Sequence, residues 1–179
     1  MKQNTFLREF MITAMCISLC IILPIAFHLI PNLGSIFSPM HIPVFLCGLT
    51  CGWQFGLLCG IVGPFFSSLL TQMPPLAYLP AMLFELAAYG IVSGVIMKHI
   101  HTKKLLFDLY ISLIISMIIG RVVAGIVNAF FFQLGKYSLS IWIGSYFISA
   151  WPAIIMHLLF IPSIYTILEK AQLVSRKYK

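Results

Sequence analysis

Two ionisable side chains stand within long apolar stretches of this sequence: Glu85 in FELAAYG and Arg121 in IIGRVVAG. A charge is costly in hydrocarbon, so such a residue faces the protein interior and meets an opposite charge or a ligand. Arg121 can offer its planar fork to a carboxylate or phosphate, while Glu85 orients that fork or accepts ligand hydroxyl groups. The structural alternative is an ion pair that joins two helices. Both arrangements can exist, one without ligand and one with it.

Polar residues accompany both charges at helical spacing. Arg121, Gly125 and Asn128 follow an i, i+4, i+7 pattern and therefore share one helix face. Glu85 and Tyr89 are four residues apart and share a face in the same way. A helix turned toward lipid would not carry arginine and asparagine on one stripe. We therefore expect a binding site lined by Arg121, Asn128, Glu85 and Tyr89.

Two further residues are candidates for the same site. His41 lies where a proline-containing loop enters an apolar segment, and it either contacts a ligand or orders the loop through a hydrogen bond. Trp142 and Tyr146 fit the aromatic belt at a membrane interface. Trp151 lies deeper in the same segment, so we expect it to form a wall of the site.

The sequence lacks the patterns of metal and catalytic sites. The pairs Cys16/Cys20 and Cys47/Cys51 are each four residues apart, without a CxxC motif or a matching histidine pair, and we interpret them as small packing residues. A phosphate-binding GxxxxGK[ST] loop, an HExxH motif and a nucleophile elbow are all missing. We expect no metal, no cofactor, no ATP hydrolysis and no enzymatic activity.

The composition is that of an integral membrane protein. Hydrophobic residues make up 61% of the chain and charged residues 8%, against roughly 25% charged residues in a soluble domain. The net charge of +7 comes from lysines and arginines at the ends of apolar runs, which form no basic face, so we do not expect nucleic-acid binding. We expect residues 1–179 to form a single membrane domain.

The positions of the basic residues determine the expected topology. The apolar segments cover residues 10–30, 42–70, 79–97, 109–132 and 142–168, and the second is long for one span but short for two. If it turns at residues 51–54, almost all lysines and arginines lie in the cytoplasm, with Lys136 alone outside. We predict an all-α six-helix bundle with both termini cytoplasmic, a short second helix, and helices over residues 10–30, 42–51, 54–70, 79–97, 109–132 and 142–168.

Glycines and prolines mark the remaining features of the bundle. Four glycines at four-residue spacing, at positions 48, 52, 56 and 60, predict close packing of helix backbones. The outer loops are expected at residues 31–41, 71–78 and 135–141, and the first two are rich in proline. Such loops are either a stiff lid over a site or short connectors.

Several segments resemble a known family over nearly the whole chain. SPMHIPV, GLTCGWQFGLLCG, the MPP loop and FELAAYG resemble the substrate-binding S component of energy-coupling factor (ECF) vitamin transporters, most like the pantothenate branch. The resemblance implies capture of a small water-soluble vitamin at the outer face of a bacterial plasma membrane. It also implies a separate transmembrane coupling subunit and two ATPase subunits. Family members dock on the coupling subunit through an AxxxA motif in the first helix, which corresponds here to Ala14 and Ser18.

A carboxylate substrate would account for Arg121. The hydroxyl and amide groups of pantothenate would suit Asn128, Tyr89 and Glu85, whereas a neutral vitamin such as pyridoxine would leave Arg121 to Glu85 alone. Hydroxymethylpyrimidine and cobalamin are further alternatives for the same role. A stand-alone secondary transporter is a different class, and it would need a coupling-ion site or a titratable pathway, for which Glu85 provides little material.

Overall fold

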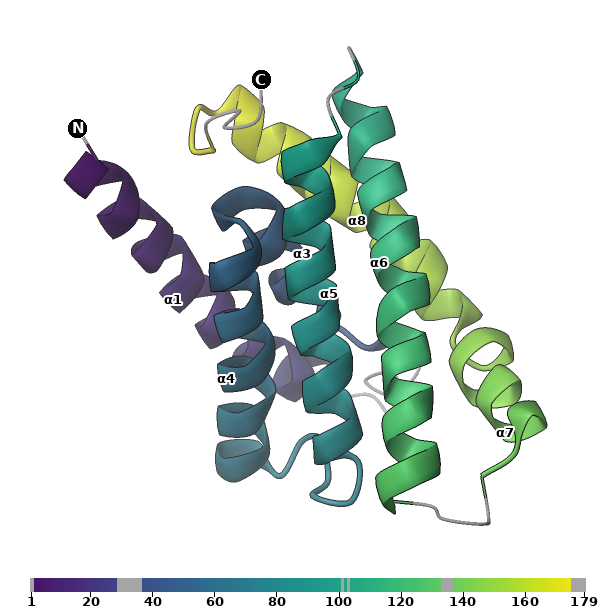
Figure 1. Ribbon diagram of the computed structural model, residues 1–179. Coiled ribbons are helices and arrows are strands. Elements are labelled where there is room, and N and C mark those ends of the chain that lie inside the picture. Colours follow the sequence, from purple (N-terminus) through teal and green to yellow (C-terminus); the bar gives the residue numbers. More distant parts are fainter. Residues whose placement is uncertain (1, 29–36, 101, 103, 133–136, 175–179) are drawn as a thin grey trace.

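The computed structural model describes residues 2–28, 37–100, 102, 104–132 and 137–174. These residues form helices and their connections, with no strand among them, as predicted (Figure 1). The elements in chain order are α1 (Lys2–His28), α3 (His41–Cys51), α4 (Trp53–Thr71), α5 (Leu79–His99), α6 (Leu105–Val127), the π-helical turn η1 (Asn128–Phe132), α7 (Leu139–Ile143), the π-helical turn η2 (Gly144–Ile148) and α8 (Trp151–Lys170).

Within the described ranges, five helices are long and apolar enough to cross a membrane. They are the part of α1 from Thr5 to Phe27, α4, α5, the continuous stretch Leu105–Phe130, and α8. The second predicted helix, α3, has only 11 residues, about 16 Å of rise, and is therefore much shorter than the hydrocarbon core. α1 and α6 begin earlier than predicted, at Lys2 and Leu105. The first turn of α1 is polar, so hydropathy does not mark it, and the first turn of α6 ends at Asp108, which interrupts the apolar segment.

The chain reverses from α3 into α4 at Gly52, within the predicted turn. Gly52 has a φ of 93°, a backbone conformation that residues with a Cβ rarely adopt. Its N–H donates to the carbonyl oxygen of Gly48 at 3.0 Å, and its own carbonyl accepts from the N–H of Gly56 at 2.9 Å. The turn therefore ends one helix and begins the next without an intervening loop.

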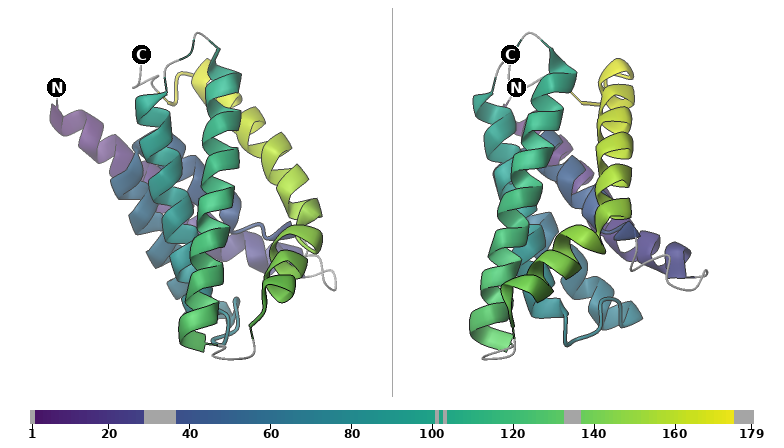
Figure 2. Two further views of the ribbon diagram at one scale, coloured as in Figure 1. Left: turned by 45° about the vertical axis from the view of Figure 1, so that its right-hand side comes forward. Right: turned by 90° about the vertical axis from the view of Figure 1, so that its right-hand side faces the viewer.

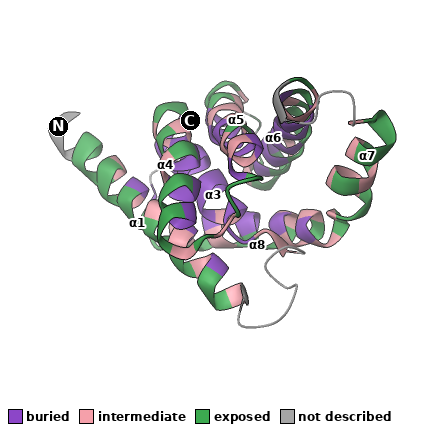
Figure 3. Cartoon of the chain, turned by 90° about the horizontal axis from the view of Figure 1, so that it is seen from below, coloured by how far each residue is buried: buried purple, intermediate pink, exposed green. Residues whose placement is uncertain are grey.

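Helix α3 forms the centre of the bundle. All of its residues except Ile42 are buried, and it packs against α1, α4, α5 and α8. Seen from below, the buried residues of the surrounding helices face α3 (Figure 3). Their outward faces expose large apolar side chains such as Leu58, Phe66 and Ile118, which is the pattern of a bundle surrounded by lipid.

Glycines bring the backbones of α4 and α5 into direct contact. A Cβ added to Gly90 of α5 would collide with the carbonyl group of Gly56 on α4. At Gly60 an added Cβ would lie 2.5 Å from the carbonyl oxygen of Leu86. Gly48 of α3 packs against the same part of α5. The glycine spacing in the sequence therefore predicted this packing surface correctly.

The helix predicted over residues 142–168 is not continuous, which corrects the sequence prediction. It is divided into α7, η2 and α8, with a turn at Ser149 and Ala150. Pro152 lies in the first turn of α8. A proline has no N–H for a carbonyl one turn earlier, and its ring disfavours helical geometry in the preceding residue, so it ends the upstream helix. As a result, α7 and η2 bridge the ends of α6 and α8 (Figure 2).

The beginning of α1 and the end of α8 lie at the same end of the bundle (Figure 1). Arg8 donates to the backbone carbonyl oxygens of Gln172, at 3.3 Å, and Leu173. Carbonyl groups after a helix C-terminus lack intrahelical donors, so a cation stabilises them. The connection from α5 to α6 lies at this end as well, whereas α6 ends at the opposite end and the short helix α3 begins well before that end.

Candidate binding site

A cavity of about 400 Å³ lies next to the start of α3 and is also lined by residues of α5, α6, η2 and α8. Its volume falls within the range of pockets that hold small molecules. Five parts of the chain contribute to its lining: Ser38 and His41; Tyr78, Ala81, Met82 and Glu85; Arg121 and Asn128; Ser145, Tyr146, Ser149 and Ala150; and Ala153 and His157.

Arg121 is buried in this cavity without an anionic partner. Its side chain is 6% exposed, and no carboxylate of the described residues forms an ion pair with it. Its Nε atom is buried and lacks a hydrogen-bond partner there. The guanidinium lies 5.4 Å from the centre of the Phe147 ring, in cation–π contact. A buried donor without an acceptor is costly, so this nitrogen is the unsatisfied polar atom of the arginine side chain.

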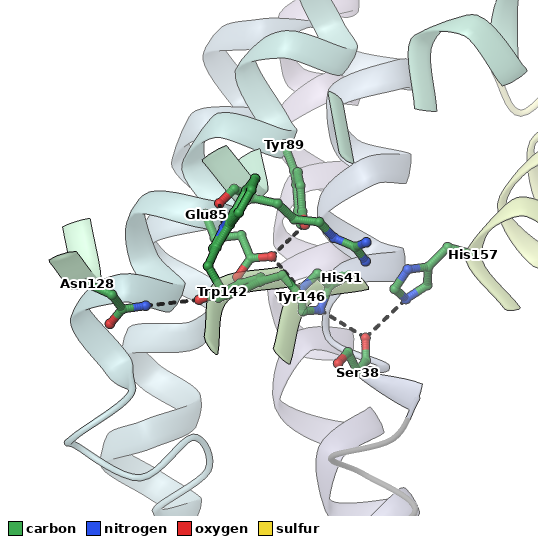
Figure 4. A network of polar contacts seen from close by, with 9 residues as sticks. Ser38, His41, Glu85, Tyr89, Asn128, Trp142, Tyr146 and His157 are labelled. Atoms are coloured by element: carbon green, nitrogen blue, oxygen red, sulfur yellow. Dashed lines mark hydrogen bonds and ion pairs between the residues drawn. The ribbon is translucent and has the colours of Figure 1, made fainter. Parts of the chain in front are cut away.

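Glu85 has partners other than Arg121. Its Oε1 accepts the hydroxyl hydrogen of Tyr89 at 2.5 Å and lies 3.9 Å from Nε2 of His41 (Figure 4). The Tyr89 ring is itself almost fully buried and stacks on Phe45, with 4.7 Å between the ring centres. Tyr89 therefore fixes the position of the Glu85 carboxylate, while Glu85 and His41 face the cavity.

Two histidines share one backbone carbonyl at the cavity wall. His41 Nδ1 lies 3.0 Å from the carbonyl oxygen of Ser38, and His157 Nε2 lies 3.3 Å from the same atom. The two rings are stacked, with 5.4 Å between their centres (Figure 4). Ser38 has a φ of 45°, which is uncommon for a residue other than glycine. The two imidazoles therefore fix a strained carbonyl at the entrance to α3.

The segment formed by α7 and η2 is attached to α6 through site residues. Asn128 donates from Nδ2 to the hydroxyl oxygen of Tyr146 at 3.1 Å (Figure 4). Trp142 donates from Nε1 to the backbone carbonyl oxygen of Arg121 at 3.0 Å, and its indole lies against Gly125. The space that Gly125 leaves on the polar stripe of α6 is thus occupied by an aromatic ring.

The structure brings together five of the six residues that the sequence predicted. Arg121, Asn128, Glu85 and His41 line the cavity, and Tyr89 contacts Glu85. Trp151 does not contribute: its side chain is 60% exposed and lies outside the cavity lining. The break before Pro152 resets the helix register, so Ala153 and His157 face the cavity in its place.

Among the lining residues that the sequence did not predict, three have polar contacts at the site: Ser38, Tyr146 and His157. The only sequence signal for His157 was a histidine within an apolar segment. From its position in the sequence Tyr146 fits an interface aromatic, and nothing in the sequence indicates the role of the Ser38 carbonyl. Part of the predicted outer loop over residues 31–41 lies outside the described residues.

The two predicted docking positions lie on the outer face of α1. Ala14 and Ser18 are both exposed, and the Ser18 hydroxyl donates to the backbone carbonyl of Ala14 at 3.0 Å. The serine is therefore satisfied within its own helix and presents little more bulk than an alanine. The opposite face of α1 carries the buried residues Thr13, Cys16 and Cys20, which pack on the bundle.

The chain is an apolar helical bundle with a small cavity, and a buried arginine is part of the cavity lining. A family model described as ECF transporter, substrate-specific component, matches residues 8–169 of the chain. The chain therefore belongs to this family, whose members are transport subunits that bind a vitamin and work with an ECF module. No curated protein and no solved structure matches the chain.

Proposed function

We propose that this protein is the high-affinity binding subunit of an ECF-type importer for pantothenate. The observation that carries the proposal is the buried guanidinium of Arg121, which has no anionic partner among the described residues and lines a cavity of about 400 Å³. Pantothenate has one carboxylate, which would accept hydrogen bonds from the arginine fork.

The other lining residues suit the remainder of this ligand. Pantothenate carries hydroxyl groups and an amide, and Glu85, His41 and Asn128 offer acceptors and donors within the same cavity. A neutral vitamin such as pyridoxine or hydroxymethylpyrimidine would leave the guanidinium without an anion. Cobalamin is far larger than this cavity. Size and charge together favour a small carboxylate vitamin.

The basic residues at one end of the bundle and the exposed face of α1 support the proposed orientation of the protein in the membrane and its proposed partners. Arg8, Lys98 and Lys104 lie at the end of the bundle opposite the cavity, so the positive-inside rule places that end, with both termini, in the cytoplasm. The cavity then faces the outside of a bacterial plasma membrane. The exposed Ala14 and Ser18 face of α1 would contact the transmembrane coupling subunit, and two ATPase subunits would complete the transporter.

A comparison of two ligands tests the proposal. Pantothenol is pantothenate with an alcohol in place of the carboxylate, so the pair isolates the contribution of the charge. We expect pantothenate at about 100 times its Kd to stabilise the purified protein by about 2.7 kcal/mol, and pantothenol or pyridoxine at the same concentration to have little effect. Equal stabilisation by pantothenol would refute the anion site.

Vesicle uptake separates this function from that of a stand-alone transporter. Pantothenate uptake should require the coupling subunit and both ATPases together with this chain. Uptake by this chain alone, driven by an ion gradient, would contradict the proposal.

A further inference from the structure

The segment formed by α7 and η2 is attached to the bundle by individual side chains. None of the residues in α7 or η2 is fully buried, so burial of apolar surface contributes little to this attachment. Trp142 makes the most direct connection, since its Nε1 donates to the backbone carbonyl oxygen of Arg121 at 3.0 Å. This bond fastens α7 to α6 at the residue that carries the buried guanidinium.

A notch in α6 receives the indole of Trp142. The notch exists because residue 125 is a glycine: an added Cβ would lie 2.5 Å from Nε1 and 2.7 Å from Cδ1 of Trp142. Side chains do not pack this closely, so the indole would have to move. A larger residue in place of Gly125 would therefore displace Trp142 from the carbonyl group of Arg121.

Phe147 connects Trp142 to the charge of Arg121. The rings of Trp142 and Phe147 meet edge to face, with 5.2 Å between their centres and 79° between their planes. The centre of the Phe147 ring lies 5.4 Å from Cζ of Arg121, so the ring attracts the cation. An aromatic ring does not accept the paired N–H bonds that a carboxylate accepts from the arginine fork. Phe147 therefore restrains the guanidinium without replacing an anionic ligand.

We propose that Trp142 is a positioning residue for the anion site. Seated against Gly125, it holds Phe147 on the guanidinium of Arg121 and so keeps the arginine fork directed into the cavity. Gly125, Trp142 and Phe147 lie outside the cavity lining, so they act on a ligand only through Arg121. The carboxylate nature of the ligand rests on the proposed function, whereas the contacts among these four residues do not.

Loss of this restraint should weaken the binding of carboxylates selectively. If the guanidinium adopts several orientations, the apparent Kd rises by the reciprocal of the fraction of molecules in the competent orientation. A cation–π contact of typical strength corresponds to about a five- to thirtyfold factor in such an equilibrium. A ligand without a carboxylate does not depend on the orientation of the fork, so its Kd should stay the same.

The first test uses the ligand-free protein. In protein with nitrogen-15-labelled arginine, the Nε–H signal of Arg121 is the one that Arg121→Lys removes, and a neighbouring aromatic ring shifts it. Phe147→Leu should move this signal, and Gly125→Ala should move it in the same direction, because it displaces Trp142 and with it Phe147. Gly144→Ala is the matched control in the same segment, since its Cβ would have open space around it, and it should leave the signal in place. An Arg121 signal that Gly125→Ala leaves unchanged would refute the inference.

Calorimetric titration with pantothenate and pantothenol is the second test. Gly125→Ala, Trp142→Leu and Phe147→Leu should each raise the Kd for pantothenate about five- to thirtyfold and leave the Kd for pantothenol within about twofold. Gly144→Ala should change neither Kd. In the Trp142→Leu background, Gly125→Ala should have no further effect, because the indole that its Cβ would meet is gone. An equal loss of affinity for both ligands would show general damage to the cavity and overturn the positioning role.

The two tests separate this inference from the proposed function. If pantothenate does not bind the unmodified protein, the proposed function fails, and the ligand-free spectra still decide whether Trp142 positions Arg121. If pantothenate binds the unmodified protein and the three variants equally tightly, the proposed function stands and the inference fails.

Discussion

Replacing Arg121 with methionine should abolish tight binding of pantothenate while leaving the fold largely intact. Methionine fills a similar volume but has neither the charge nor the fork of donors. Two charge-assisted hydrogen bonds to a carboxylate contribute about 1.5–3 kcal/mol each. Their loss should raise the Kd by about 10² to 10⁴-fold, since 1.4 kcal/mol corresponds to a factor of ten.

The expected cost to folding is much smaller, for reasons that the structure supplies. Arg121 forms no ion pair with Glu85, which keeps its contacts with Tyr89 and His41 after the substitution. The cation–π contact with Phe147 is lost, at about 1 kcal/mol. The bond from Trp142 goes to the backbone of residue 121 and is retained. We expect the melting temperature to fall by about 2–4 °C.

Calorimetric titration and thermal unfolding of the same preparations would measure both effects. Arg121→Lys is the matched control, because it keeps the charge without the fork and should weaken binding by an intermediate amount. If Arg121→Met binds pantothenate as tightly as the unmodified protein, the arginine has only a structural role. A collapse of the fold in Arg121→Met would instead show that the guanidinium has an intramolecular partner in solution.

Three other substitutions test separate parts of the structure. The double substitution of leucine for Ala14 and Ser18 should prevent co-purification with the coupling subunit, because bulky residues separate closely packed helices. The variant should still bind pantothenate. Co-purification at the normal yield would contradict the docking role of α1. Gly90→Ala should lower the free energy of unfolding by about 1–3 kcal/mol, since the added Cβ would meet the Gly56 backbone. The control Gly144→Ala has open space around it and should change the free energy of unfolding by less than about 0.5 kcal/mol. Equal melting temperatures of the two variants would refute the close packing. Trp151→Ala should leave the Kd for pantothenate within about twofold of the unmodified protein. Tyr146→Phe removes the acceptor of the Asn128 hydrogen bond and should weaken binding several-fold. A larger loss of affinity in Trp151→Ala than in Tyr146→Phe would show that Trp151 belongs to the site.

Much of the helical framework could be predicted because it depends on local chemistry. Long apolar segments identify membrane helices, the distribution of lysines and arginines favours a turn near Gly52, and glycines at four-residue spacing indicate close backbone packing. Arg121 and Glu85 were recognisable because a charge within an apolar segment needs a partner or a ligand. These features require no knowledge of how the helices are arranged.

The remaining features of the site depend on the arrangement of the helices. The sequence leaves open whether Arg121 and Glu85 pair with each other or with a ligand. In the structure Glu85 contacts Tyr89 and His41, because the start of α3 inserts His41 beside α5. Trp151 was misplaced because a hydropathy profile does not record that Pro152 restarts the helix. The shared Ser38 carbonyl joins residues 38 and 157, a contact between distant parts of the chain that no local pattern encodes.

A crystal structure of the protein bound to pantothenate would test the central claim most directly. We predict one pantothenate molecule in the cavity between α3, α5, α6 and α8, with its carboxylate oxygens within hydrogen-bond distance of the Arg121 guanidinium. Glu85 should remain hydrogen-bonded to Tyr89 in that complex. A ligand bound elsewhere, or an Arg121 side chain paired with Glu85 while the carboxylate lies apart from it, would contradict the assignment of this cavity as an anion-binding site.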